Sequence, residues 1–289
     1  MSTTPPVGPA ADPVAGLLAA GIPAGRAQAL VSAGLTAEVG GHLVVVGEMT
    51  DRLSGERMVL VAGGADAVVR DAHLTDELRT LVARRHPGVG TLMVRAERES
   101  EPAAAIGAQL VMRYVESGPP PVSAPPESEW RVRPYEAADR EPVADLLARA
   151  IEAGYTSVGV PAAEPQTRQF VDDLLDRTDD DVTVFCAFRR DRFAGHATVV
   201  WDEDDLTGRL RPELFDVFVL PEHRATPASR LLTAAAVSWA AAAGFRLRGH
   251  VVGGDENAQA VFRRLVADGW RPAEAYWRLS TRPSHNGRR

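Results

Sequence analysis

Disulfide-forming cysteines and long apolar runs are both missing from this sequence. Its 289 residues include one cysteine, Cys186, so no intrachain disulfide framework can form, which fits a reducing cytoplasm. Cys186 lies in the apolar run Val184–Phe188, where we expect a small core residue rather than a nucleophile. No apolar run approaches the roughly 20 residues that cross a bilayer, and no signal-peptide pattern opens the chain. These absences predict a cytoplasmic protein with no membrane segment.

Basic side chains are scarce relative to acidic ones. The sequence has no lysine, and its 32 arginines face 39 acidic residues, giving a net charge of −7. Nucleic-acid binding depends on clustered basic side chains, so this balance argues against it. The acidic runs at 179–181 and 202–205 are expected to be solvated turns; the alternative is that they attract a cationic amine to a nearby mouth. We expect no metal site.

A proline-rich segment divides the chain. Five prolines occur within residues 117–129, which predicts an extended linker. Residues 130–283 are expected to form the main domain and residues 13–116 a smaller α/β domain, and the length of the chain allows two cores. Residues 1–12 and 284–289 are expected to be tails.

The segment from Leu214 to Gly244 is the most informative. Leu214–Leu220 is an apolar run rich in aromatic and β-branched residues, which predicts a strand. Thr226 can cap the alanine-rich helix that follows, and Pro227 suits its first position. The turn between strand and helix would direct free backbone N–H groups and the positive end of the helix at an anion. Arg224 adds a positive charge, so the segment predicts a phosphate site.

The run Val219-Leu-Pro-Glu-His-Arg-Ala-Thr-Pro-Ala-Ser229 resembles the pyrophosphate loop of the GNAT superfamily of acyl-CoA N-acyltransferases. In that family, Val-x-Pro-x-x-Arg leads into a glycine-containing turn and a helix; here Pro227 and Ser229 replace both glycines. The resemblance covers the main domain and implies an α/β (α+β) fold, a mixed, splayed sheet flanked by helices. The implied strands are 130–134, 182–188, 192–201, 214–220, 245–252 and 275–280, and the implied helices include 139–153, 166–175 and one that Asp255 opens.

The resemblance also implies acetyl-CoA or another acyl-CoA as donor and a small-molecule primary amine as acceptor. A strand N–H near Val219 would hold the oxyanion. His223 is a surface turn residue or a proton carrier, and Asn257 either holds the pantetheine or caps its helix. The implied donor-binding residues are Phe218, Val219, His223, Arg224, Ala225, Thr226, Ala228, Ser229 and Asn257.

Two titratable residues interrupt apolar strands and are the candidate catalytic groups. Asp216 is either hydrogen-bonded scaffold or a base with a raised pKa, because an unpaired buried carboxylate is costly. His250 lies where the family's central strands separate and is either a base or acid, or an ordinary strand histidine; His196 has a weaker claim. We expect Asp216 and His250 within roughly 10 Å of each other, facing one cleft. Tyr155 and Trp201 are candidates for the acceptor wall or for simple packing.

Two observations leave alternatives open. Many family members carry a general-acid tyrosine four residues before the glycine that closes the last helix, whereas Leu265 stands there and no tyrosine lies on that helix. Ile106–Tyr114 echoes Asp268–Tyr276, so the first domain is either a degenerate GNAT-like half or an unrelated small α/β domain. The alternative functions are a non-catalytic ligand-binding module, or a transferase with a non-CoA donor such as a carrier protein or aminoacyl-tRNA. Either a monomer or a homodimer is expected.

Overall fold

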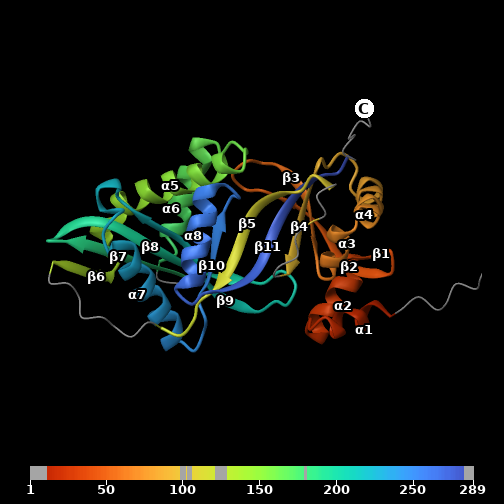
Figure 1. Cartoon of the computed structure of the whole chain (residues 1–289), viewed down its shortest axis with the longest axis horizontal. Helices are drawn as coiled ribbons and strands as arrows, with labels where there is room; N and C mark the ends of the chain where they lie inside the picture. The colour runs from red at the N-terminus through yellow and green to blue at the C-terminus, as the bar shows by residue number, and fades with distance from the viewer. Residues whose placement is uncertain (1–11, 98–101, 103–105, 121–128, 179–180, 283–289) are drawn as a thin grey trace, which may run out of the picture.

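One mixed sheet of eleven strands runs through the described part of the molecule (Figure 1). The computed structural model describes residues 12–97, 102, 106–120, 129–178 and 181–282. The strand order is β1-β2-β3-β4-β11-β5-β10-β9-β8-β7-β6. The strands are β1 (Thr36–Val39), β2 (His42–Thr50), β3 (Arg57–Ala62), β4 (Thr91–Glu97), β5 (Gln109–Glu116), β6 (Trp130–Pro134), β7 (Val182–Arg189), β8 (Arg192–Glu203), β9 (Leu210–Val219), β10 (Arg248–Val252) and β11 (Arg271–Ser280).

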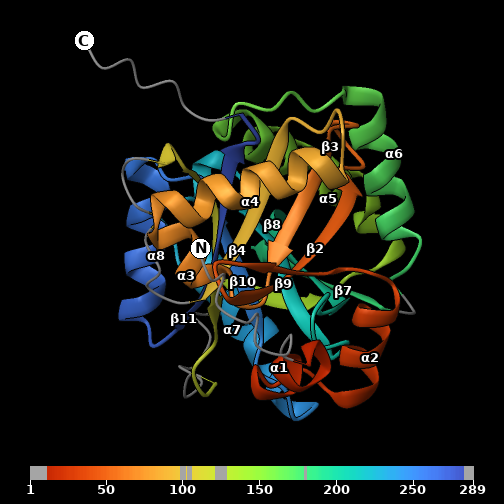
Figure 2. The ribbon, with the colours of Figure 1, turned by 90° about the vertical axis from the view of Figure 1, so that its right-hand side faces the viewer.

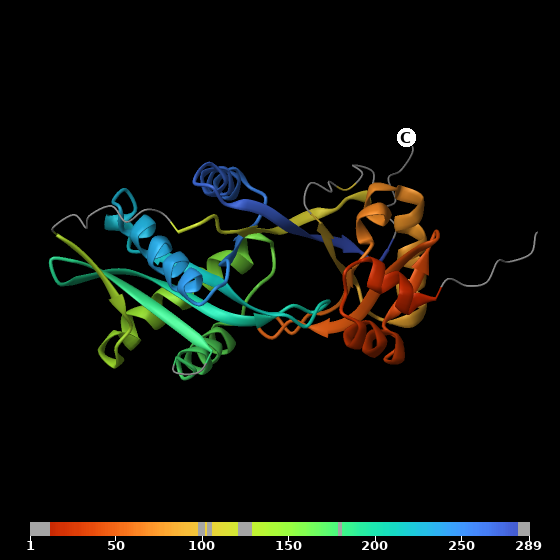
Figure 3. The same ribbon diagram turned by 90° about the horizontal axis from the view of Figure 1, so that it is seen from below.

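Helices cover both faces of this sheet. The α-helices are α1 (Pro13–Ala19), α2 (Ala24–Ser32), α3 (Ala65–Arg70), α4 (Ala72–Arg85), α5 (Arg140–Ser157), α6 (Glu164–Leu175), α7 (Ala228–Ala242) and α8 (Glu256–Ala267). On the second half of the sheet, α7 packs on one face and α5 with α6 on the other (Figure 3). On the first half, α4 lies across β2 to β4, and α1 with α2 packs on the opposite face (Figure 2). None of the helices in these described ranges has the length and apolarity of a membrane span.

The two halves of the chain exchange their last strands. We call residues 12–120 the first half and 129–282 the second half. The second half ends in β11, which lies between β4 and β5 of the first half, and β5 in turn pairs with β10 (Figure 1). The segments Ile106–Tyr114 and Asp268–Tyr276, which echo each other in sequence, therefore carry antiparallel neighbours at the centre of the sheet. Backbone pairing joins the halves.

The predicted strand–turn–helix at Leu214–Gly244 is confirmed, with one shift at the helix start. Helix α7 begins at Ala228, and Pro227 rather than Thr226 is the capping residue. The Thr226 hydroxyl donates to the His223 carbonyl at 2.6 Å and accepts weakly from the Ala228 N–H at 3.4 Å. Gly244, at φ +83°, ends the helix in the left-handed region that favours glycine.

Most other predicted elements are found, with different ends. The strand at 130–134 is confirmed, whereas the predicted strand 245–252 begins only at Arg248. Cys186 is fully buried in the core, as expected. In the first half, the sequence predicted neither β1 nor α3. Most of the predicted tails and of the proline-rich linker lies outside the described residues.

Two turns repeat both sequence and structure. Asp51-Arg-Leu-Ser-Gly55 joins β2 to β3, and Asp204-Asp-Leu-Thr-Gly208 joins β8 to β9. The Asp51 Oδ1 atom accepts from the N–H groups of the third and fourth residues of its turn, at 3.0 and 2.7 Å. The Asp204 Oδ1 atom accepts from the equivalent groups at 3.1 and 2.8 Å. The halves therefore share an internal repeat that extends beyond the one noticed in the sequence.

Each of these turns is anchored in the other half. Leu53 of the first turn is buried among residues of α5 and α6, and the Asp51 Oδ2 atom accepts from the Tyr155 hydroxyl at 2.6 Å. Leu206 of the second turn packs against the α1–α2 cluster, and Arg95 of β4 donates to Asp204 at 2.8 Å. Reciprocal turns as well as reciprocal strands thus hold the halves together.

Candidate functional site

The central strands β9 and β10 separate after a short parallel pairing. Only Glu213 with Arg248 and Leu214 with Gly249 are paired. Beyond these positions β9 continues along β8 and β10 continues along β5, so their facing edges are not paired with each other. The pairing ends at Gly249, so the strands separate from His250 onward, as the resemblance implied.

The unpaired edge of β9 presents a backbone donor. The Leu220 N–H bonds the Ala194 carbonyl, just beyond the end of β9, at 2.9 Å. In an antiparallel ladder, consecutive residues direct their N–H groups to opposite sides. The Val219 N–H is therefore directed away from β8, toward the separated β10. This is the group that the resemblance implies for the oxyanion.

His250 is held by a buried carboxylate that the sequence analysis missed. Its Nδ1–H donates to Glu213 Oε1 at 2.9 Å, and Arg248 lies 3.5 Å from the other carboxylate oxygen. Burial alone would raise the pKa of Glu213, but the bond to His250 and the Arg248 charge hold that pKa below its usual value. Because the Glu213 carboxylate accepts at Nδ1, the Nε2 atom of His250 is left to act as an acceptor.

Asp216 faces His196 rather than an arginine. Asp216 Oδ2 lies 3.4 Å from His196 Nε2, and neither atom has a hydrogen-bond partner among the described residues. Burial raises the pKa of Asp216 to about 7, although the nearby His250 charge opposes the shift. Burial lowers the pKa of the fully buried His196 to about 3. The Asp216 side chain keeps 19% of its area exposed, so it is not sealed from solvent.

The first half contributes an aromatic side chain beside His250. Tyr114 of β5 is the register partner of His250, and their ring centroids are 5.5 Å apart. The Arg248 guanidinium lies 3.5 Å from the Tyr114 ring centroid, and Tyr276 of β11 lies on the other side at 5.4 Å. Burial, above all, raises the pKa of Tyr114 well above its usual value, so its hydroxyl stays protonated. The contact between Tyr114 and His250 depends on the register between strands that are far apart in the sequence, so the sequence did not predict it.

The turn after β9 keeps free donors at the start of α7. The N–H groups of His223, Arg224 and Thr226 bond carbonyls within the turn. No backbone partner is found in the described structure for the N–H groups of Ala225, Ser229 and Arg230. Arg224 is exposed, with its guanidinium 6.0 Å from the Phe218 ring centroid. A charged side chain and three amides at a helix N-terminus suit an anion.

The remaining predicted donor residues differ in accessibility. Ala228 is fully buried, and His223 packs edge-on against Trp130 with 5.6 Å between ring centroids. The capping interpretation of Asn257 is wrong, because Asp255 caps α8 by accepting from the Ala258 N–H at 2.7 Å. Asn257 is exposed on the first turn of α8, so its amide is free of that structural role.

The two candidate acceptor-wall residues do not lie together. Tyr155 of α5 belongs to the face of the sheet that α5 and α6 cover. Trp201 packs edge-on against Trp239 of α7 and Phe245, with ring centroids 5.9 and 5.0 Å away, on the α7 side. They therefore cannot wall one cleft, and the packing interpretation holds for Trp201.

Comparison with known proteins gives a family match in the second half. Residues 144–266 match the model of the acetyltransferase (GNAT) family. A search of curated proteins found no match. Similar solved structures include a tandem GNAT protein from the clavulanic acid biosynthesis pathway, at 19% identity and TM-score 0.44, covering 86% of this chain and 85% of that one.

Two other solved structures are similar at the same low level. A GCN5-related N-acetyltransferase from Kribbella flavida is 15% identical with a TM-score of 0.45, covering 90% of this chain and 96% of that one. The aminoglycoside N-acetyltransferase AAC(6')-Iy in complex with CoA is 18% identical with a TM-score of 0.38, covering 51% and 91%. By sequence, residues 144–266 of the second half match the family model of the GNAT acetyltransferases.

Proposed function

We propose that the second half transfers an acyl group, the acetyl group of acetyl-CoA, to the primary amine of a small molecule. The observation that carries this proposal is the hydrogen bond between His250 and Glu213 at the separation of β9 and β10. It leaves a basic nitrogen beside a strand edge whose Val219 N–H is directed into the same separation. Together with the family match, this pair favours an enzyme over a ligand-binding module.

The reaction needs one proton to move from amine to thiol. The neutral amine attacks the thioester carbonyl, and the Val219 N–H stabilises the oxyanion that forms. His250 Nε2 accepts the ammonium proton, while Glu213 stabilises the resulting imidazolium. Collapse of the intermediate forms the amide, breaks the C–S bond and releases a thiolate, which takes a proton from solvent or from His250. Asp216, with its raised pKa, is the second candidate for the base.

The donor's pyrophosphate would bind at the start of α7. Arg224 supplies charge, and the amides of Ala225, Ser229 and Arg230 supply donors. The Phe218 side chain and the exposed Asn257 would lie along the pantetheine. The acceptor would approach from the face that carries α5 and Tyr155.

Two measurements on the purified chain test the proposal. Calorimetry with acetyl-CoA and with free CoA should give micromolar dissociation constants. Release of free thiol from acetyl-CoA should then be followed against a panel of polyamines, aminoglycosides and amino-acid amides, and at least one amine should accelerate it. Binding without acceleration by any amine would favour a ligand-binding module.

One observation favours a second candidate, a transferase with a different donor. Pro227 has no N–H, and Ser229 places a side chain where the family has glycine. Both changes reduce the backbone available to a pyrophosphate. Absence of CoA binding at millimolar ligand would support this alternative, and acyl-carrier protein is then the donor to test first.

A further inference from the structure

The repeat allows the outer edge of the first half to be compared with that of the second. β1 and β7 occupy equivalent places, and each enters its hairpin through a two-residue turn with positive φ. These turns are Gly40-Gly41, at φ 55° and 82°, and Arg190-Asp191, at φ 47° and 65°. β7 carries β6 on its outer side, whereas β1 is the last strand of the described sheet. The position equivalent to β6 is therefore open in the described structure.

The open edge of β1 presents backbone hydrogen-bonding groups. Val39 and His42 flank the two-residue turn and so form a hydrogen-bonded pair within the hairpin. Alternation then directs the backbone groups of Glu38 and Thr36 outward. Arg85 donates to the outward Thr36 carbonyl at 2.9 Å, which agrees with this direction and leaves Glu38 as the free position. An unpaired strand edge is a template for another extended chain.

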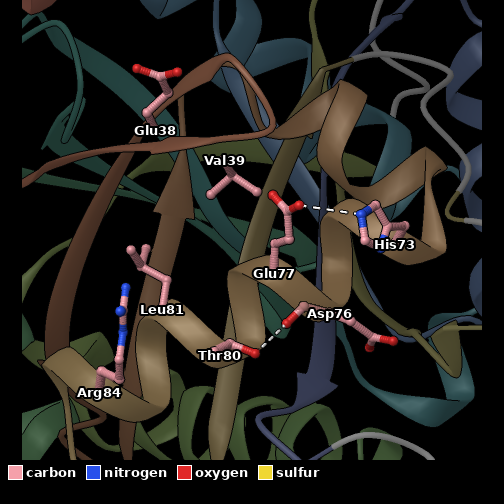
Figure 4. A pocket seen from close by; sticks show the side chains of 8 residues that line it. All are labelled: Glu38, Val39, His73, Asp76, Glu77, Thr80, Leu81 and Arg84. Atoms are coloured by element: carbon pink, nitrogen blue, oxygen red, sulfur yellow. Dashed lines mark hydrogen bonds and ion pairs between the residues drawn. The ribbon is translucent and has the colours of Figure 1, made fainter. Parts of the chain in front are cut away.

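A hollow of about 430 Å³ lies beside this edge, between β1 and α4 (Figure 4). Val39 and Leu81 give it an apolar part. Its charged rim carries the Glu38 carboxylate, the Arg84 guanidinium and Glu77, which lies 3.3 Å from His73. The Asp76 carboxylate is already paired with the buried Arg79 at 2.8 Å. The residues that line the hollow are Glu38, Val39, His73, Asp76, Glu77, Thr80, Leu81 and Arg84.

The second half shows what kind of segment fits such a place. In β6, Trp130 and Val132 pack into the cluster that contains α7, and the residues between and after them are arginines. Arg133 pairs with Asp139 at 2.6 Å. Alternating basic and apolar residues thus satisfy a sheet edge that has a helix on one side and a carboxylate on the other.

We propose that the groove formed by β1 and α4 binds an extended segment of a partner protein in which arginine or lysine alternates with apolar residues. The segment adds as a strand to the β1 edge through the backbone of Glu38. By alternation, its basic side chains lie on the face of the sheet that carries the exposed Glu38 carboxylate, and its apolar side chains lie on the α4 face, against Val39 and Leu81. This proposal is independent of the acyl-transfer reaction, because the groove lies at the end of the sheet remote from β9 and β10.

The chain's own β6 sequence provides a probe. A fluorescein-labelled peptide Glu-Trp-Arg-Val-Arg-Pro-Tyr, copied from residues 129–135, is titrated with the full chain and followed by fluorescence anisotropy. Saturable binding that weakens with salt is expected. A peptide with glutamate at both arginine positions should bind at least about tenfold more weakly. No saturation by the first peptide at millimolar protein, or equal affinity for both peptides, overturns the proposal.

Two substitutions of Glu38 separate the contribution of its backbone N–H group to peptide binding from that of its side-chain charge. Glu38→Pro removes the outward N–H without removing a hydrogen bond to β2, whereas Glu38→Gln keeps the N–H and removes only the charge. Strand addition predicts a loss of about tenfold or more for the proline variant and a smaller loss for the glutamine variant. Equal affinities for these two variants exclude strand addition.

The identity of the occupant needs one more variant. Deletion of residues 1–11 should leave peptide affinity unchanged. If the peptide binds only after this deletion, the groove belongs to the chain's own N-terminal segment and the partner proposal is wrong. Sedimentation of the full chain, with and without Glu77→Lys, tests the remaining occupant: a dimer that this substitution dissociates would assign the groove to a second copy.

Discussion

The two halves of the sheet have equivalent strands but different side chains at the equivalent of the candidate site. His250 pairs with Tyr114 across β10 and β5, and Arg95 pairs with Tyr276 across β4 and β11. Since Tyr114 and Tyr276 are equivalent in the repeat, Arg95 occupies in the first half the place of His250 in the second. The parallel pairing of β3 with β4 ends at Val94, one residue before Arg95, just as that of β9 with β10 ends one residue before His250.

The comparison continues along the neighbouring strand. Leu60 stands where the second half has Glu213, and Ala62, the partner of Val45, stands where it has Asp216, the partner of Thr198. After β3 the chain enters α3 through Gly63 and Gly64, without a counterpart of the turn that carries Arg224. The repeated scaffold thus forms the separation of strands twice, whereas the groups suited to proton transfer and anion binding occur once. The repeat explains the architecture, and a few residues determine where chemistry can take place.

Arg95, unlike His250, takes part in a network of ion pairs that joins the two halves. It donates to Asp204 and forms an ion pair with Glu274 at 2.7 Å, and Glu274 also accepts from Arg248 at 2.8 Å. Through Arg248 and Glu213 this chain of charges reaches His250. Arg95, which occupies the place of His250 in the first half, therefore helps to hold the proposed base in the second half. Removing one member of such a buried network leaves a charge without its partner, which is costly.

The largest effect is expected from removing the proposed base. His250→Gln should lower turnover by about 10²–10⁴-fold, the usual contribution of a general base, with donor affinity unchanged. Steady-state thiol release and calorimetry measure the two quantities. Tyr276→Phe is the matched control, because it alters an aromatic residue of the same row without touching His250. Turnover within about threefold of the wild type in His250→Gln would transfer the role to Asp216, and Asp216→Asn should then show the loss.

The next effect concerns the reciprocal turns. Leu53→Ala should destabilise the chain by about 2–4 kcal/mol, because it opens a cavity among the buried residues of α5 and α6. Leu206→Ala should cost less, about 1 kcal/mol, because Leu206 is only partly buried. Urea denaturation measures both. Equal costs would contradict the difference in burial, and no cost for Leu53→Ala would show that the first turn does not hold the second half.

Local patterns predicted the second half well, and its site only in part. Pro221, Pro227 and the apolar run of the strand indicated β9 and α7, because those signals act over a few residues, whereas the family resemblance implied β6. Glu213 and Tyr114 were missed, since their importance depends on the register between strands that are far apart in the sequence. The repeated Asp-x-Leu-Ser/Thr-Gly turn was a readable signal, and comparing the two turns would have revealed the exchange of contacts between halves.

A smaller effect is expected at the anion site, which the first half lacks. Arg224→Ala should weaken acetyl-CoA binding by about 1–3 kcal/mol, the scale of a charge-assisted contact. Its exposure predicts little change in thermal stability. Calorimetry compares the variant with Arg230→Ala, which lies one turn further along and is also exposed. An unchanged dissociation constant for Arg224→Ala would remove it from the donor site.

The smallest expected effect is the pH dependence that Asp216 and His196 give to stability, because their contributions oppose each other. Burial raises the pKa of Asp216 to about 7, so its contribution to folding is fully present below its unfolded pKa near 4 and is lost as the pH rises through 7. Burial lowers the pKa of His196 to about 3, so stability is lost as the pH falls from about 6.5 toward 3. Between pH 4 and 6.5 the two slopes largely cancel in the wild-type chain.

Substituting Asp216 should reveal the pH dependence of stability that comes from His196. Asp216→Asn removes the loss that accompanies rising pH, so its stability relative to the wild type should increase between pH 5 and pH 7.5 by up to a few kcal/mol. Urea denaturation at the two pH values gives this difference. Asp191→Asn, in an exposed turn where asparagine tolerates the positive φ of 65°, is the matched control and should show the same stability difference from the wild type at both. The stability difference between Asp216→Asn and the wild type could instead be the same at both pH values. That result would mean that the Asp216 carboxylate of the wild type is ionised well below neutral pH. The proposed proton transfer would then depend on His250 alone.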